Sequence, residues 1–470
     1  MSYQKPQYGP GSQQEDCLQR YEKALAEGRM VYLDEEEMEL VIDHYFDQQR
    51  LSEATVAANY AIDLHPDSVS LRASLVKLLL MEKKMKDAET LLKPLVEEAP
   101  QNINVMLCHG EVLLYHEKEE EALKLFKSML KSNAAPVDEI CLSISFILAD
   151  YELFDQANRY LTYGYTHGGS ANRDLCFQRA VVKEQMGLHE EAITAYNEIL
   201  DNDPYDNDAW FNLGQVYFAL NRYDEALEAY DYASVTDRHD YQAFLQIAHC
   251  YFQKEAYMKA IEEYKKYAKL SGDDTAPLYI FIGECYEQMG MLDECYQYFS
   301  KATECDPDNP DGWAGLCIYE MRKGNHTAAL EHVKHAISLN PDVKSYWMYL
   351  GDIFQELGEE DMALNAFKHA EAIFGEDNQE LLTSIAEILI DKGQYDEAFF
   401  YTQKALRAED AQNTIPELPV VHAIALYKTG QTDAALEWLS IALERDEKNK
   451  EAFFTICEEA QTDPRFFRFI

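Results

Sequence analysis

The apolar residues between positions 205 and 238 recur with the spacing of two short helices. Within each segment they return every three or four residues, so they share one stripe of a helix, and a short break at Asn221–Arg222 separates the two stripes. The first stripe contains Trp210, Leu213, Gly214 and Tyr217, and the second contains Ala226, Tyr230 and Ala233. Because large and small side chains alternate, the pattern predicts two helices that pack closely against each other.

The small residue of the second helix returns along the whole chain at intervals of 34 to 37 residues. It occupies twelve positions, which are Ala54, Ala88, Ala122, Ala157, Ala192, Ala226, Ala260, Cys295, Ala329, Ala363, Ala398 and Ala435. Twelve residues before it, the first helix often carries another small residue, which is glycine at Gly110, Gly214, Gly283 and Gly351. This regularity predicts twelve consecutive helical hairpins, with every interval above 34 residues explained by an insertion in a loop.

Glycine and proline mark the ends of these predicted helices. The break between the two helices of a hairpin recurs as Gly187, Gly290, Gly324, Gly358, Gly393 and Gly430. Several hairpins close at a proline, namely Pro66, Pro100, Pro204, Pro307 and Pro341. Proline stops one helix and favours the start of the next, so these residues separate neighbouring hairpins.

The spacing W-x-x-L-G-x-x-Y followed by A-x-x-x-Y at residues 210–230 resembles the tetratricopeptide repeat, a helix–turn–helix unit of about 34 residues. The resemblance extends over nearly the whole chain. It implies an all-α fold, a right-handed α-solenoid of about twelve TPR repeats with a C-terminal capping helix. A single repeat cannot bury its own apolar face, so stacked neighbours are expected to share one continuous core.

We expect four segments along the chain. They are a disordered tail (1–13), an N-terminal helix and connector (14–33), the TPR solenoid (34–447), and a capping helix with a tail (448–470). Asp34, followed by three glutamates, is expected to cap the first helix of the solenoid, and the last helix is expected over 449–462. The aromatic and cationic tail at 464–470 either folds onto the final helix or docks in an acidic groove.

The charge balance narrows the choice of partner. With 41 basic and 85 acidic residues the formal net charge is −44, so we expect neither nucleic acid nor an anionic membrane as a partner. One interpretation of this acidic charge is that it keeps a long exposed solenoid soluble. The more specific interpretation is that the ligand is a basic or neutral polypeptide. The chain has no apolar run of about 18 residues and no export signal, and its ten cysteines lie singly, so a cytoplasmic location with reduced thiols is expected.

In the resembled family, the first helices of successive repeats line a concave groove that binds peptides or protein segments. The matching positions in the central repeats of this chain are Gln178, Asn212, Gln215, Phe218, Gln246, His249, Phe252 and Glu284. Side-chain amides can bond to an extended backbone, and aromatic rings provide apolar anchors. The alternative is a solvated amide face with partly buried rings.

The chain departs from the chaperone-binding members of the family at one functional feature. Those members hold a terminal carboxylate with paired cationic and amide side chains, whereas the equivalent positions here carry Phe211 with Gln215 and Ile280 with Glu284. The groove also contains several carboxylates. Capture of an acidic C-terminus by that mechanism is therefore not expected, and a basic or neutral segment fits better.

No catalytic, metal or cofactor site is expected. His332, His335 and His369 lack matched carboxylate or cysteine spacing, and the acidic loops at 201–208 and 305–312 lack the closing glutamate of a calcium loop. We therefore expect a protein-interaction scaffold or adaptor rather than an enzyme. The alternative is a non-catalytic regulatory subunit of an enzyme or chaperone-type complex. The sequence indicates no particular oligomeric state.

Overall fold

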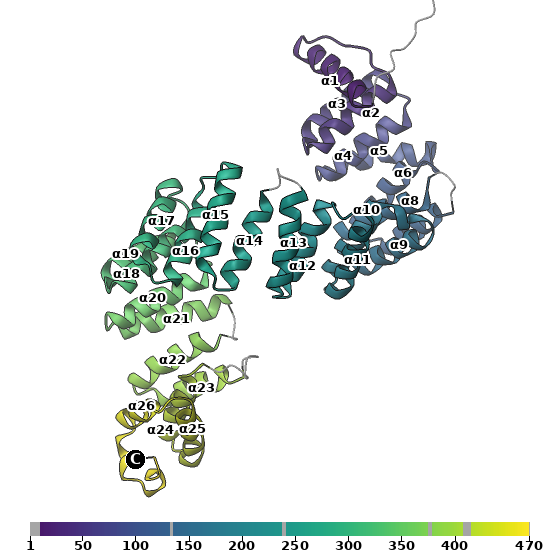
Figure 1. Ribbon diagram of the computed structural model, residues 1–470. Coiled ribbons are helices and arrows are strands. Elements are labelled where there is room, and N and C mark those ends of the chain that lie inside the picture. The colour runs from purple at the N-terminus through teal and green to yellow at the C-terminus, as the bar shows by residue number, and fades with distance from the viewer. Residues whose placement is uncertain (1–9, 132–134, 237–240, 375–377, 408–414, 470) are drawn as a thin grey trace, which may run out of the picture. The chain divides into compact units, whose positions relative to one another are not determined.

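The computed structural model describes residues 10–131, 135–236, 241–374, 378–407 and 415–469, and within these ranges its secondary structure is helical throughout (Figure 1). Two compact units, Met1–Asp237 and Arg238–Ile470, divide the chain. In each unit the helices form pairs, and each pair packs on the next. The predicted all-α solenoid of helix–turn–helix repeats is confirmed.

In its described residues, the first unit contains α1 (Pro10–Ala26) and six helix pairs. The pairs are α2 (Glu35–Asp47) with α3 (Leu51–Leu64), α4 (Val69–Met81) with α5 (Met85–Glu98), α6 (Ile103–Tyr115) with α7 (Glu119–Met129), α8 (Val137–Asp150) with α9 (Phe154–Thr166), α10 (Arg173–Gln185) with α11 (His189–Asn202), and α12 (Asn207–Ala219) with α13 (Tyr223–Thr236). Residues 1–9 of the expected tail (1–13) lie outside the described residues. Helix α1 already begins at Pro10, within the expected tail.

The described part of the second unit contains six further pairs and a short last helix. The pairs are α14 (Gln242–Gln253) with α15 (Tyr257–Ser271), α16 (Ala276–Gln288) with α17 (Leu292–Cys305), α18 (Pro310–Arg322) with α19 (His326–Leu339), α20 (Lys344–Glu356) with α21 (Glu360–Phe374), α22 (Gln379–Asp391) with α23 (Tyr395–Ala405), and α24 (Leu418–Lys428) with α25 (Thr432–Arg445). The last helix is α26 (Asn449–Ile456). The loop residues 132–134, 375–377 and 408–414 lie outside the described residues.

The core has the large-against-small packing that the sequence pattern predicts. All twelve small residues of the second helices have no solvent exposure. On the first helices, glycine lies opposite an aromatic ring from the second helix, in the pairs Gly110 with Phe126, Gly214 with Tyr230, Gly283 with Phe299, and Gly351 with Phe367. The absent side chain is what allows the two helices to approach.

The turn inside each hairpin contains a residue with a left-handed backbone, always five residues before the small residue. Six of these are glycines, among them Gly290 and Gly393 with φ of 70° and 71°. The other six are Gln49, Lys83, Glu117, Glu152, Asn221 and Glu255, with φ between 57° and 59°. The geometry of the turn is therefore constant, although only half of the repeats use the residue that adopts it without steric cost.

Side-chain caps fix the start of several first helices. Asp34 accepts a hydrogen bond from the amide of Glu37, whose carboxylate accepts one from the amide of Asp34, so the predicted cap is confirmed as a capping box. Between repeats, tryptophan binds the proline turn, because Nε1 of Trp210 donates to the carbonyl of Pro204 at 2.9 Å and Nε1 of Trp313 donates to that of Pro307 at 2.9 Å. These bonds hold α12 and α18 at the end of the repeat before them.

The last helix is shorter than the predicted helix over 449–462. Helix α26 ends at Ile456, and 3-10 turns follow at Glu458–Thr462 and Pro464–Phe466, because the chain turns at Cys457 with φ −108° and ψ 56°. This turn brings Phe466 into the core, with its ring centroid 5.6 Å from that of Phe453 and 5.4 Å from that of Tyr427. In the described residues the tail thus packs on the last helices.

Candidate functional site

The first-helix residues of the first unit differ in how much surface they offer. Gln178 on α10 is only 7% exposed, so little of it can meet a partner. Asn212 on α12 donates from Nδ2 to the carbonyl of Asp208 in its own helix at 2.8 Å. Gln215 is exposed, and Phe218 is half-buried with its ring edge against Tyr223 at 5.5 Å. Gln215 is the most accessible of these four side chains.

In the second unit, Gln246, His249 and Phe252 lie on α14 and are half-buried. The His249 ring packs edge-on against Tyr264 at 5.6 Å and Phe281 at 5.0 Å, and burial lowers its pKa. Its Nε2 has no hydrogen-bond partner among the described residues. Phe252 packs on Tyr257 at 5.5 Å. His249 is therefore a neutral ring in an aromatic cluster, more suited to an apolar contact than to a charge.

Glu284 on α16 belongs to a recurring acidic register. It comes one residue after the small residue of its first helix, and Asp352 on α20 and Glu387 on α22 hold the same position in later repeats. Burial among protein atoms, reinforced by nearby carboxylates, raises the pKa of Glu284 and Glu387 to about 7 and that of Asp352 to about 6. Glu284 remains exposed to solvent, so water screens it more than the half-buried Glu387.

Each of these three carboxyls interacts with a carboxylate near the start of the next first helix. The acidic pairs are Glu284 with Asp311, Asp352 with Glu380, and Glu387 with Glu417. Two carboxylates that repel each other in a partly desolvated environment favour protonation of one of them, or the binding of a cation. The same register in the first unit contains Glu111, whose pKa burial and Asp150 raise to about 7.

The sequence interpretation included Glu284 among the candidate site residues but did not name Glu111 or Glu387. A signal was available, because both follow directly after a small register position, Gly110 and Ala386. What the sequence could not supply is the pairing with Asp150 or Glu417, which depends on how neighbouring first helices pack.

A hollow of about 650 Å³ lies beside the acidic register in the second unit. Its lining combines carboxylates with apolar and aromatic side chains, and includes Glu287, Ile318, Met321, Tyr349, Asp352 and Glu356. One cation, Arg322, also lines it and pairs with Glu287 at 2.5 Å. The hollow can therefore accept a side chain that has both an apolar stem and a positive end.

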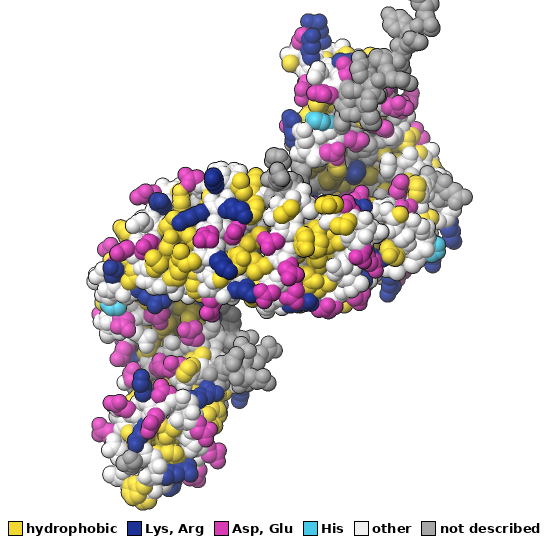
Figure 2. Space-filling view, viewed as in Figure 1, with side chains coloured by type: hydrophobic (Ala, Val, Ile, Leu, Met, Phe, Trp, Pro, Cys, Tyr) yellow, Lys and Arg dark blue, Asp and Glu magenta, His cyan; other side chains and the backbone are white. Residues whose placement is uncertain are grey.

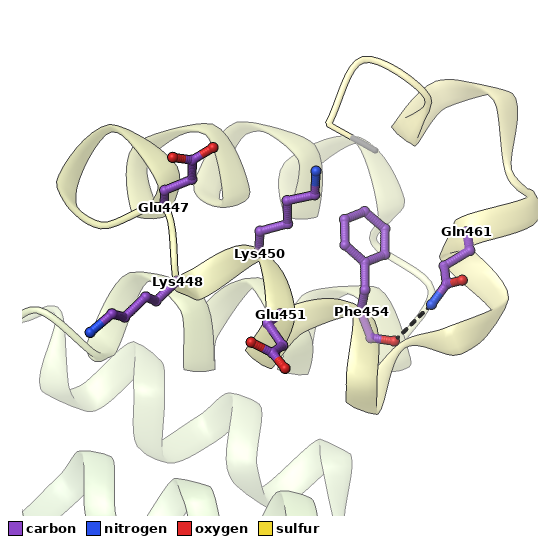
Figure 3. Close-up of a pocket in the computed structure, with 6 residues that line it drawn as sticks. All are labelled: Glu447, Lys448, Lys450, Glu451, Phe454 and Gln461. Carbon is purple, nitrogen blue, oxygen red and sulfur yellow. Dashed lines mark hydrogen bonds between the residues drawn. The ribbon is translucent and has the colours of Figure 1, made fainter.

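A second hollow, of about 430 Å³, lies at the C-terminal end (Figure 3). Two glutamates and two lysines line it, together with Phe454 and Gln461, and Nε2 of Gln461 donates to the carbonyl of Phe454 at 3.3 Å. Because the charges balance, this hollow has no evident preference for a cation or an anion.

The histidines considered as metal ligands lie against tryptophans. The rings of His332 and His335 are 5.7 Å and 4.5 Å from Trp313, and His369 is 3.9 Å from Trp347. Across the described ranges, no group of three or more histidine, cysteine or acidic side chains is placed to hold a metal ion. Over the same residues, no helix has the length and apolar character needed to span a bilayer.

Paired short helices, a constant left-handed turn and a buried small residue in each repeat define an all-helical repeat solenoid. Four family models described as tetratricopeptide repeat match residues 45–106, 177–238, 276–309 and 342–455. The chain belongs to the tetratricopeptide repeat family.

Individual relatives are similar over limited stretches. TPR repeat-containing protein MJ1428 of Methanocaldococcus jannaschii is 29% identical over 27% of this chain and 22% of its own length. RNA polymerase-associated protein CTR9 of Caenorhabditis elegans is 26% identical over 32% of this chain and 14% of its own length. The crystal structure of the APC/C hetero-tetramer Cut9-Hcn1 aligns with 88% of this chain and 99% of that chain, at 14% identity and a TM-score of 0.42. The match thus spans less than a quarter of either curated relative.

Proposed function

We propose that this protein is a non-catalytic interaction scaffold that binds a basic polypeptide segment along its first helices. The acidic composition favours a basic or neutral segment over an acidic one. The three acidic pairs of the second unit favour a basic segment over a neutral one. In each pair, a carboxylate from the next repeat adds to the raised pKa of the first carboxyl, so the two charges repel each other. A lysine or arginine side chain placed between them would relieve their repulsion.

The hollow beside Asp352 supports the same ligand chemistry. Ile318, Met321 and Tyr349 give an apolar wall for the stem of a long cationic side chain, while Asp352 and Glu356 lie at its charged end. Family membership agrees with this role, since stacked repeats present extended binding surfaces. CTR9, one of the relatives, is named as associated with RNA polymerase.

A fluorescent peptide of alternating lysine and glycine tests the proposal by anisotropy titration of the full-length protein. The variant Glu284→Gln, Asp352→Asn, Glu387→Gln removes one member of each acidic pair. We expect it to bind the peptide on the order of tenfold more weakly or worse than wild type, because three close charge contacts are lost. The matched control Glu262→Gln, Glu304→Gln, Glu331→Gln removes three exposed carboxylates from second helices and should bind nearly as wild type does.

The pH dependence gives a second readout. A bound cation favours the ionised carboxylates, so wild type should bind more tightly as pH rises through the raised pKa values of about 6 and about 7. The triple amide variant should lose this dependence. Equal affinities of the two triple variants would show that the acidic pairs do not recognise the peptide.

A further inference from the structure

A row of lysines interrupts the acidic surface of the second unit on its second helices. Lys265 on α15 and Lys334 on α19 lie five residues after the small register residue, and Lys301 on α17 lies six residues after it. We call Lys265, Lys301 and Lys334 the lysine row. They come from three consecutive repeats, and all three are exposed.

Lysines hold this register in other repeats too, as Lys93, Lys127, Lys368 and Lys404, but Lys368 and Lys404 pair with Glu397 and Glu371. In the two repeats before α15, the same two positions carry Asn197 and Glu198 on α11, and Asp231 and Tyr232 on α13. A chain with 85 acidic and 41 basic residues has carboxylates available for almost every cation. Even so, no member of the row forms an ion pair with a carboxylate of the described residues, whereas its neighbour Lys266 pairs with Glu263 at 3.4 Å.

The three lysines of the row contact aromatic rings instead of carboxylates. The Lys265 ammonium lies 5.8 Å from the ring of Tyr298, and the Lys301 ammonium lies 5.1 Å from the same ring, so Tyr298 links two repeats. Lys334 lies 5.9 Å from the ring of Phe354 in the next repeat. A ring face orients a cation without neutralising it, which leaves the positive charge free to meet an anion.

The electrostatic environment of Lys265 agrees with this view. Burial would lower the pKa of Lys265, but electrostatic interaction with Tyr298 and Tyr286, together with hydrogen bonding to them, outweighs burial and raises that pKa. The ammonium therefore stays protonated next to two hydroxyl groups that can also donate to an anion. Figure 2 shows dark-blue lysine and arginine side chains grouped among yellow apolar and aromatic ones over α15 to α17.

We propose that the lysine row is a docking surface for an acidic polypeptide segment of a partner protein. Charge complementarity selects an anion, and the rings beside the lysines suit an extended segment that carries apolar side chains between its carboxylates. A nucleic acid would face the repulsion of the −44 net charge on the rest of the molecule. This surface uses second helices and binds acidic ligands, so it is independent of the first-helix site for basic segments.

The test uses a fluorescent peptide of alternating glutamate and glycine with the full-length protein at low salt. The variant Lys265→Gln, Lys301→Gln, Lys334→Gln should bind it on the order of tenfold more weakly or worse, because three cationic contacts are lost. The matched control Lys93→Gln, Lys124→Gln, Lys127→Gln removes three exposed lysines from second helices of the first unit and changes the net charge equally. It should bind as wild type does, and lysine-to-arginine changes in the row should preserve binding.

Two further probes separate charge recognition from other binding. A peptide of alternating glutamine and glycine should bind none of the proteins, and single-stranded oligothymidylate should bind more weakly than the acidic peptide. Equal binding of the acidic peptide by the row variant and the control variant would overturn the proposal, as would absence of binding by wild type. Tighter binding of oligothymidylate than of the acidic peptide would overturn the assignment of a polypeptide.

Discussion

The ring of Tyr230 lies against the backbone of Gly214, so closely that a Cβ on this glycine would come within 2.6 Å of the ring carbon Cε1. Both residues are buried, and they belong to the two helices of one hairpin, α12 and α13. The same relationship recurs in other repeats, so the distance between paired helices depends on it.

Substitution of Gly214 by alanine should therefore destabilise the protein. We expect a loss of about 1 to 3 kcal/mol in the free energy of unfolding, the usual cost of overpacking a core, measured by urea denaturation. In a Tyr230→Leu background the ring is gone, so the same Gly214→Ala change should cost less. An equal cost in both backgrounds would mean that the ring contact is not the cause.

The turns without glycine offer a stabilising change. Glu255 adopts φ 57°, which costs an L-residue about 1 to 2 kcal/mol, while glycine loses about 0.5 to 1 kcal/mol of chain entropy. Glu255→Gly should thus raise the free energy of unfolding, by up to about 1.5 kcal/mol. Its neighbour Lys254, with φ −85°, is the matched control, and Lys254→Gly should lower stability.

Two adjacent phenylalanines at the C-terminus, one buried and one exposed, allow the packing of the tail to be tested. Phe466 is fully buried against Phe453 and Tyr427, whereas Phe467 is 59% exposed. Phe466→Ala should cost about 3 to 5 kcal/mol and increase hydrogen exchange in α25 and α26. Phe467→Ala should change stability by no more than about 0.5 kcal/mol. Similar effects of the two substitutions would argue against a capping role for the tail.

The raised pKa of Glu387 predicts how stability depends on pH. Its folded-state pKa of about 7 lies above the ordinary value of 4.5, so the folded protein binds the proton more tightly than the unfolded chain. Stability from this group is therefore present at acidic pH and is lost as pH rises towards and through 7. Calorimetry should show that Glu387→Gln raises the melting temperature at about pH 8 and has little effect at about pH 5. A gain of the same size at both values would contradict the shifted pKa.

The sequence by itself determined the repeat and its boundaries. The spacing of small residues placed twelve hairpins, because each position in a helical hairpin meets the same neighbours in every repeat and so requires the same size of side chain. It also located caps such as Asp34 and turns such as Gly290, since these depend on the local backbone. The same local rules did not show that the chain would turn at Cys457 and fold Phe466 back into the core.

Only the tertiary structure decided which charged side chains become neighbours. Glu387 and Glu417, or Lys265 and Tyr298, belong to different repeats, and their proximity follows from the packing of one hairpin on the next. It also showed that Gln178, a polar residue at an expected groove position, is almost fully covered. Helix periodicity gives the face on which a residue lies, whereas its surroundings depend on contacts between elements far apart in the sequence.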